Sequence, residues 1–153
     1  MEDLIINFVP TGMIPSKEMT PYVPVTPEEI IEQVHEAYEY GITLTHLHAR
    51  DENEHPTYKI AYYEKILQGV RHHCPDLVVC LSLSGRSFNE LEKRSESLAL
   101  QPDMGSLTLS SLNFSKQASV NSPEMIMGLL EEMSKYGVKP EICLLYTSDA
   151  ADE

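Results

Sequence analysis

Apolar and polar positions follow two different periods along the 153 residues of the chain. Short, mostly apolar runs are typical of buried strands and predict strands at 4–9, 42–48 and 139–146. They also predict a strand that runs into a polar turn over 76–85 and a strand followed by a loop over 102–114. Between these runs, apolar residues recur every three or four positions, which predicts helices over 27–40, 58–73, 88–100 and 123–136.

End signals support the helix predictions. Thr26 is placed to cap the first helix, Pro27 occupies its first position, Glu29 follows three residues after the cap, and Gly41 ends it. Ser122 is placed in the same way to cap the helix predicted over 123–136. These helices are therefore predicted with defined starts.

Strands and helices alternate four times, and a fifth strand then begins. Helices of this length between strands imply parallel pairing through right-handed crossovers. The predicted class is therefore α/β, either a doubly wound open sheet or a (β/α)₈ barrel. No glycine-rich fingerprint follows the first strand, which argues against a nucleotide-binding fold.

Charge and composition narrow the function. The net charge of −13 repels phosphate backbones, so we expect no nucleic-acid partner. The apolar runs are too short to cross a bilayer, so we expect no membrane association, and the acidic start does not resemble an export signal. The three cysteines show no CxxC pair and indicate reduced thiols in the cytoplasm, with Cys80 packed in a strand.

The motif "THLHARD" contains the clearest candidate for a metal site. His46 and His48 are two residues apart at a strand end, so both rings point to one face and can converge on a metal ion such as zinc. Leu47 points to the opposite side. Two histidines alone do not complete a zinc site, and none of the carboxylates stands out as a third ligand, so a surface turn with two idle imidazoles is an open alternative.

Hydroxyl groups gather at the same predicted edge. Ser82, Ser106 and Thr108 lie toward the carboxyl ends of neighbouring strands, where parallel α/β proteins place their active sites. With backbone N–H groups near Gly85, these hydroxyls could hold a carboxylate, although serine and threonine also serve as ordinary caps.

Several motifs together resemble the β-keto acid cleavage enzymes. They are "TGMIPSKEMTPYVPVTPEEI", "THLHARD", "SGR" and "PDMGSLTLSSLNF…NSPEMI…YGVKPE", in this order, over about residues 4–142. The resemblance implies a zinc-dependent (β/α)₈ TIM barrel, usually homo-oligomeric, of which this chain holds about four β-α units and the start of strand five. It also implies a reaction of a β-keto acid with acetyl-CoA that gives acetoacetate and a new acyl-CoA.

The resemblance also implies roles for single residues. His46 and His48 match the family's zinc-binding histidines, and Ser82 matches its serine at the substrate carboxylate. Ser106 stands where characterised relatives have a threonine, and Gly85 and Thr108 are placed at the substrate pocket. The family's third zinc ligand is a late glutamate near a catalytic aspartate and an arginine, none of which this chain reaches.

Ile14 departs from the family pattern. Relatives that act on the aminated substrate have a glutamate there, which pairs with the substrate ammonium, whereas an aliphatic side chain cannot form that ion pair. We therefore expect a substrate with an apolar or uncharged tail.

The chain is predicted to have two parts. Residues 1–142 correspond to the first half of the barrel, and 143–153, "CLLYTSDAADE", are predicted to be translated transposon-end and sequencing-adaptor DNA attached to a truncated gene. A genuine tail is the alternative, and finding these codons in the source genome would establish it.

Two other functions stay open from sequence. The chain could belong to another metal-dependent carbon–carbon lyase built on a barrel, because HxH also serves in such enzymes. It could also be a non-catalytic half-barrel whose histidines bind nothing, and in every case the fragment alone is expected to be inactive.

Overall fold

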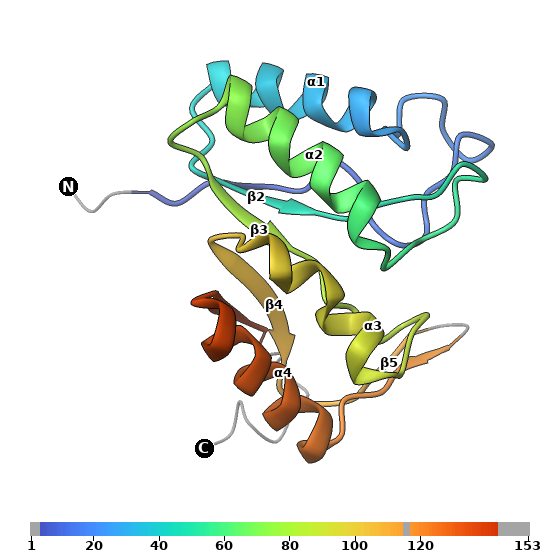
Figure 1. Ribbon diagram of the computed structural model, residues 1–153. Coiled ribbons are helices and arrows are strands. Elements are labelled where there is room, and N and C mark those ends of the chain that lie inside the picture. The colour runs from blue at the N-terminus through green and yellow to red at the C-terminus, as the bar shows by residue number, and fades with distance from the viewer. Residues whose placement is uncertain (1–3, 115–116, 144–153) are drawn as a thin grey trace.

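A five-stranded parallel sheet organises the chain, shown in a computed structural model that describes residues 4–114 and 117–143 (Figure 1). The strands are β1 (Asn7–Phe8), β2 (Leu44–Leu47), β3 (Val78–Leu81), β4 (Met104–Thr108) and β7 (Lys139–Cys143). A separate antiparallel pair, β5 (Leu112–Asn113) and β6 (Ala118–Ser119), follows β4 and was not predicted.

Strand order decides between the two predicted architectures. The order is β1-β2-β3-β4-β7, so each new strand of the large sheet adds beside the previous one. A doubly wound sheet would reverse direction at a switch point, whereas a (β/α) barrel adds its strands in sequence. The α/β class is therefore confirmed, with an arrangement consistent with part of a barrel.

Helices connect successive strands of the large sheet. They are α1 (Pro27–Glu39), α2 (Ile60–His73), α3 (Leu91–Ser95), the 3₁₀ helix η1 (Glu96–Leu100) and α4 (Pro123–Tyr136). The helix predicted over 88–100 is thus a short α-helix continued by a 3₁₀ helix. Among the described residues, no helix is long and apolar enough to cross a membrane.

The predicted helix caps are present. Thr26 and Glu29 form a reciprocal capping box: the Thr26 hydroxyl accepts from the Glu29 N–H, and the Glu29 carboxylate accepts from the Thr26 N–H. In α4 the Ser122 hydroxyl accepts from the Met125 N–H. Gly137 ends α4 with a φ of 72°, a left-handed conformation that favours glycine.

One face of the sheet forms the core with the helices. The side chains of Leu47, Val79, Leu81 and Leu107 are fully or almost fully buried on this face. They belong to two apolar clusters, one with α1 and α2 and the other with η1 and α4. The side chains at the alternate positions of these strands point to the opposite face of the sheet.

That opposite face carries the polar side chains of interest. His46 of β2 is the register partner of Cys80 of β3, and Ser106 of β4 is the partner of Glu141 of β7. Paired residues in adjacent parallel strands point to the same side, and Leu47 points away from it.

The first strand is shorter and more exposed than the sequence predicts. The run 4–9 was predicted as a short buried strand, which is wrong: only Asn7–Phe8 pair, and the Leu4 and Ile5 side chains are each 76% exposed. β1 lies at the sheet edge and is covered on one side only. The predicted adaptor-derived tail lies outside the described residues except for Cys143, which ends β7.

Candidate functional site

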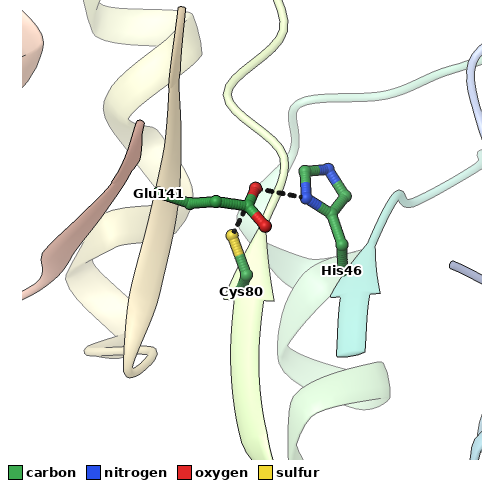
Figure 2. Close-up of side chains that lie close together, drawn as sticks. All are labelled: His46, Cys80 and Glu141. Carbon is green, nitrogen blue, oxygen red and sulfur yellow. Dashed lines mark hydrogen bonds and ion pairs between the residues drawn. The ribbon is translucent and has the colours of Figure 1, made fainter. Parts of the chain in front are cut away.

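Three side chains from three strands converge on the open face of the sheet. His46 projects from β2, Cys80 from β3 and Glu141 from β7, as Figure 2 shows. Their ligand-type atoms all lie within 4.8 Å of one another. Because each side chain stands on a hydrogen-bonded strand, the sheet itself fixes this cluster.

The Glu141 carboxylate accepts hydrogen bonds from three donors. Its Oε2 lies 2.7 Å from Nδ1 of His46 and 3.3 Å from Sγ of Cys80, and its Oε1 lies 3.1 Å from Nδ2 of Asn7. The hydrogen bond from His46 lowers the Glu141 pKa more than burial raises it. An ionised carboxylate can only accept, so Nδ1 of His46 carries a proton and Nε2 keeps its lone pair.

Cys80 is a protonated thiol in this arrangement. Burial raises its pKa far above the ordinary value, and the neighbouring Glu141 charge raises it further. The S–H group therefore donates to the carboxylate.

His48 lies beside His46 and is held in its neutral form. The two ring centroids are 5.1 Å apart. Burial, followed by the positive fields of neighbouring groups that include Arg50 and Arg86, lowers the His48 pKa to about 3. Its Nδ1 atom is buried and finds no hydrogen-bond partner in the described part of the chain.

The donor set fits a zinc ion. Two imidazoles, a thiol and a carboxylate are the groups that zinc binds in proteins, at about 2.0–2.3 Å. Neutral imidazole is the form that coordinates metals, and the orphaned Nδ1 of His48 is a buried polar atom that a ligand would satisfy.

Two arginines make the surroundings of His48 positive. The Arg50 guanidinium donates to the backbone carbonyls of Glu54, Gly12 and Pro15, and Arg86 lies with its guanidinium carbon 3.5 Å from the Phe114 ring centroid. Within residues 4–114 and 117–143, neither arginine forms an ion pair with a carboxylate. Both charges therefore favour an anionic ligand nearby.

The predicted hydroxyl residues occupy different environments. Ser82 directly follows β3 and is buried, and the Ser106 hydroxyl accepts from the Leu83 N–H at 2.9 Å. Thr108 is the last residue of β4 and is half-buried. In the described part of the chain the Ser106 hydroxyl has no acceptor, so its hydrogen stays available to donate.

Gly85 has a packing reason to be glycine. A Cβ built there would lie 2.6 Å from Nη1 of Arg94 and 2.9 Å from the Val120 carbonyl oxygen. This close approach lets the buried Arg94 reach the Leu83 carbonyl at 2.8 Å and the Asn121 amide oxygen at 2.8 Å.

Ile14 and the remaining histidines lie apart from the three-residue cluster. The Ile14 side chain is 56% exposed, in the loop whose flanking carbonyls Arg50 binds. His35, His55, His72 and His73 are exposed, as a solvated role predicts.

Sequence reasoning did not single out Glu141, Cys80 or Asn7 as a group. Glu141 stood in the "KPE" motif at the predicted fifth strand, and Cys80 was correctly predicted to be packed in a strand. Period-two alternation places Glu141 on one face of its strand, but only the strand order brings that face to His46.

Comparisons with known proteins identify the family of the chain. A family model for the beta-keto acid cleavage enzyme matches residues 3–151. The 3-oxoadipate:acetyl-CoA acetyltransferase of Cupriavidus necator is 39% identical over 138 residues, which are 90% of this chain and 48% of that protein. The 3-keto-5-aminohexanoate cleavage enzyme of Acetoanaerobium sticklandii is 33% identical over 153 residues, 99% of this chain and 56% of that protein.

The chain spans about half the length of these curated relatives. Among solved structures, the apo structure of ObcA superposes with a TM-score of 0.73 at 22% identity, covering 80% of this chain and 30% of that one. This likeness supports the fold and is consistent with a partial barrel.

Proposed function

The chain belongs to the β-keto acid cleavage enzyme family, and from this premise we propose that the whole protein is a zinc-dependent enzyme that converts a β-keto acid and acetyl-CoA to acetoacetate and a new acyl-CoA. The observation that carries the proposal is the convergence of His46, Cys80 and Glu141, with His48 beside them. A metal ion held by side chains needs several donor atoms that converge on one point, as these do.

His46 and His48 would hold the zinc. When bound there, zinc supplies Lewis-acid polarisation of the β-keto group. The Glu141 carboxylate fixes the position and tautomer of His46, as carboxylates beside metal-binding histidines commonly do. Burial and neighbouring positive charges keep the His48 imidazole neutral, so the lone pair of its unprotonated nitrogen stays available.

Hydroxyls and positive charge would bind the substrate carboxylate. Ser82 directly follows β3, Ser106 lies within β4 and Thr108 ends it. Gly85 lies in the turn after β3. Arg86, which has no carboxylate partner in the described residues, adds a positive field. Together these groups favour an anionic substrate over a neutral one.

Ile14 determines which substrate tail the site would accept. Its aliphatic side chain cannot pair with an ammonium group, and burying an unpaired ammonium costs several kcal/mol. The proposed substrate therefore has an uncharged tail. Turnover of an aminated keto acid by the complete enzyme at the rate of its uncharged analogue would contradict this assignment.

Zinc titration of this chain tests the metal site. Wild-type protein should bind zinc in calorimetry, and the His46→Ala, His48→Ala double variant should not. His35→Ala, His55→Ala is the matched control because both residues are exposed and lie outside the cluster. Equal zinc binding by the site variant and wild type would favour the half-barrel with idle histidines.

Dependence on acetyl-CoA separates the two enzymatic functions. A complete reading frame, expressed with zinc, should form acetoacetate from a β-keto acid only when acetyl-CoA is present. Cleavage without acetyl-CoA would instead favour another metal-dependent carbon–carbon lyase. A homo-oligomeric state, a cytoplasmic location and low activity of this chain alone are further parts of the proposal.

A further inference from the structure

One side chain ties the loop after β1 to the rest of the described structure. The Arg50 guanidinium donates from Nη2 to the carbonyls of Gly12 and Pro15, the latter at 2.9 Å. Among the described residues, the segment 10–15 forms no other hydrogen bond, and the buried Thr11 hydroxyl has no partner. The position of this segment therefore depends on Arg50.

Ile14 lies between the two carbonyls that Arg50 binds. Its side chain is 56% exposed, so apolar burial does little to hold it in place. The preceding residue, Met13, lines a small cavity together with Ser82. The loop therefore reaches the serine that is proposed to bind the substrate carboxylate.

Arg50 is itself firmly held. It is only 4% exposed, and its Nη1 donates to the Glu54 carbonyl at 2.8 Å. The turn after Arg50 is closed by its own hydrogen bonds, because the Asp51 N–H donates to the His55 carbonyl and the Asp51 carboxylate accepts from the His55 N–H. Arg50 also follows His48 by two residues, so the chain segment that carries the metal-binding histidines also holds the loop after β1.

We propose that Arg50 is a positioning residue for substrate selection: by holding both flanks of Ile14, it fixes the side chain that discriminates between substrate tails. This inference rests on the proposed function in one respect, namely that Ile14 contacts the substrate tail. The attachment of the loop to Arg50 does not depend on that function and can be tested on this chain alone.

The chemistry of arginine explains why this residue type holds the loop. Three carbonyl oxygens accept from the two terminal nitrogens of one planar group, whereas lysine offers a single nitrogen. Arg50→Lys therefore keeps the positive charge beside His48 but loses part of the attachment. This variant separates the position of the loop from the electric field at the histidines.

Limited thermolysin digestion of the 153-residue chain tests the attachment. Thermolysin cleaves before large apolar residues, so Met13 and Ile14 report opening of the loop. Arg50→Lys should speed cleavage at these two sites at least about tenfold, because hydrogen bonds from a charged donor are strong and cleavage follows the population of the open form. Arg71→Lys is the matched control and should not change this cleavage, because Arg71 donates to the Gln101 carbonyl at the surface.

The substrate selectivity of the complete enzyme tests the consequence. Ile14→Glu should raise kcat/KM for an aminated β-keto acid at least about tenfold, because the ammonium group regains a partner in the site. Adding Arg50→Lys should remove most of this gain, and adding Arg71→Lys should preserve it. With Arg50→Lys alone, KM for the uncharged β-keto acid should change more than kcat, since the loop acts on binding and not on the reacting atoms.

Several results would overturn the inference. Unchanged cleavage at Met13 and Ile14 in Arg50→Lys would mean that Arg50 does not hold the loop. Faster cleavage at many sites would mean that Arg50 only stabilises the fold, as would failure of both Arg50→Lys and the second variant Arg50→Gln to fold by circular dichroism.

The selectivity assay separates this inference from the proposed function. If the gain from Ile14→Glu survives Arg50→Lys, the loop attachment does not affect substrate selection, and the inference fails while the proposed function stands. A complete enzyme that forms no acetoacetate would overturn the proposed function and the role in selection together. The digestion would still decide whether Arg50 holds the loop.

Discussion

Glu141 is the residue through which three strands of the sheet meet. Asn7 of β1, His46 of β2 and Cys80 of β3 all donate to its carboxylate, although Glu141 stands on β7. A single side chain thus links the first three strands to the last one described. Replacing Glu141 should therefore disturb both metal binding and the positions of the side chains on the open face of the sheet.

Glu141→Gln should lower zinc affinity by about 10–100-fold, since removing a carboxylate that contacts a metal-binding histidine has effects of this size. The amide keeps the shape of the side chain but loses the charge. Calorimetric zinc titration measures the change. Glu132→Gln is the matched control, because among the described residues Glu132 forms its ion pair with the exposed Lys135 on α4. Unchanged affinity in both variants would count against the site.

Arg94 is a buried cation that holds backbone and side-chain oxygens together. It donates to the Leu83 carbonyl, the Val120 carbonyl and the Asn121 amide oxygen, and burial lowers its pKa to about 10. Arg94→Met should reduce the free energy of unfolding by about 2–4 kcal/mol, because buried acceptors lose their donors. Urea denaturation measures this.

The exposed Arg71 provides the comparison for Arg94. Its guanidinium reaches the Gln101 carbonyl and lies 3.9 Å from Asp103 at the surface. Arg71→Met should change the free energy of unfolding by less than about 0.5 kcal/mol. Similar losses in the two variants would mean that the buried hydrogen bonds of Arg94 do not stabilise the fold.

Residue-scale prediction from sequence succeeded where the signal was local. The HxH spacing identified His46 and His48 as neighbours, and the structure places their rings 5.1 Å apart. Glu141 is 95 positions from His46, so only the strand order could reveal that the two side chains meet. No periodicity in a single strand contains that information.

At the scale of elements, helices were more predictable than strands. Amphipathic spacing located α1, α2 and α4 to within a few residues, and caps also marked the starts of α1 and α4. These signals lie inside or beside each helix. The β5–β6 pair was missed, since two-residue strands leave almost no pattern. β1 was predicted longer and more buried than it is, because an apolar run does not reveal that its strand lies at an edge.

The start of α1 gives a prediction with a defined pH dependence. Burial raises the Glu29 pKa, but hydrogen bonds from Lys17 and from the Val25 and Thr26 N–H groups outweigh it, so the pKa lies below its ordinary value of 4.5. The folded state therefore binds this proton more weakly than the unfolded state. The Glu29 contribution to stability is present above pH 4.5 and is lost as the pH falls through the folded pKa.

Glu29→Gln should consequently destabilise the protein at pH 7 and much less at pH 3. Thr26→Ala removes the other half of the capping box and should cost about 1 kcal/mol at both pH values, because the hydroxyl does not titrate. Urea unfolding at the two pH values measures both. A Glu29→Gln effect that does not depend on pH would contradict the assigned ion pair.

At the scale of the whole molecule, the described sheet is covered on one face and bounded by two edges. Helices pack on one face, while β1 and β7 each pair on one side only among the described residues. Apolar side chains are exposed along these edges and beside them, namely Leu4, Ile5, Val9 and Ile142. Unpaired backbone groups beside exposed apolar side chains favour pairing with another chain.

The chain should therefore self-associate, and salt should strengthen the association. The net charge of −13 opposes contact between copies at low ionic strength, whereas salt screens that repulsion and leaves the apolar contribution in place. Sedimentation velocity should show dimers or larger species whose fraction rises with sodium chloride. Ile5→Lys with Ile142→Lys should shift the chain toward monomer, because each substitution places a charge at a sheet edge. Met127→Lys, at an apolar position of α4 that is about as exposed as Ile142, should not. A monomer at all salt concentrations, with a sharp thermal transition, would show that the edges are stable without a partner.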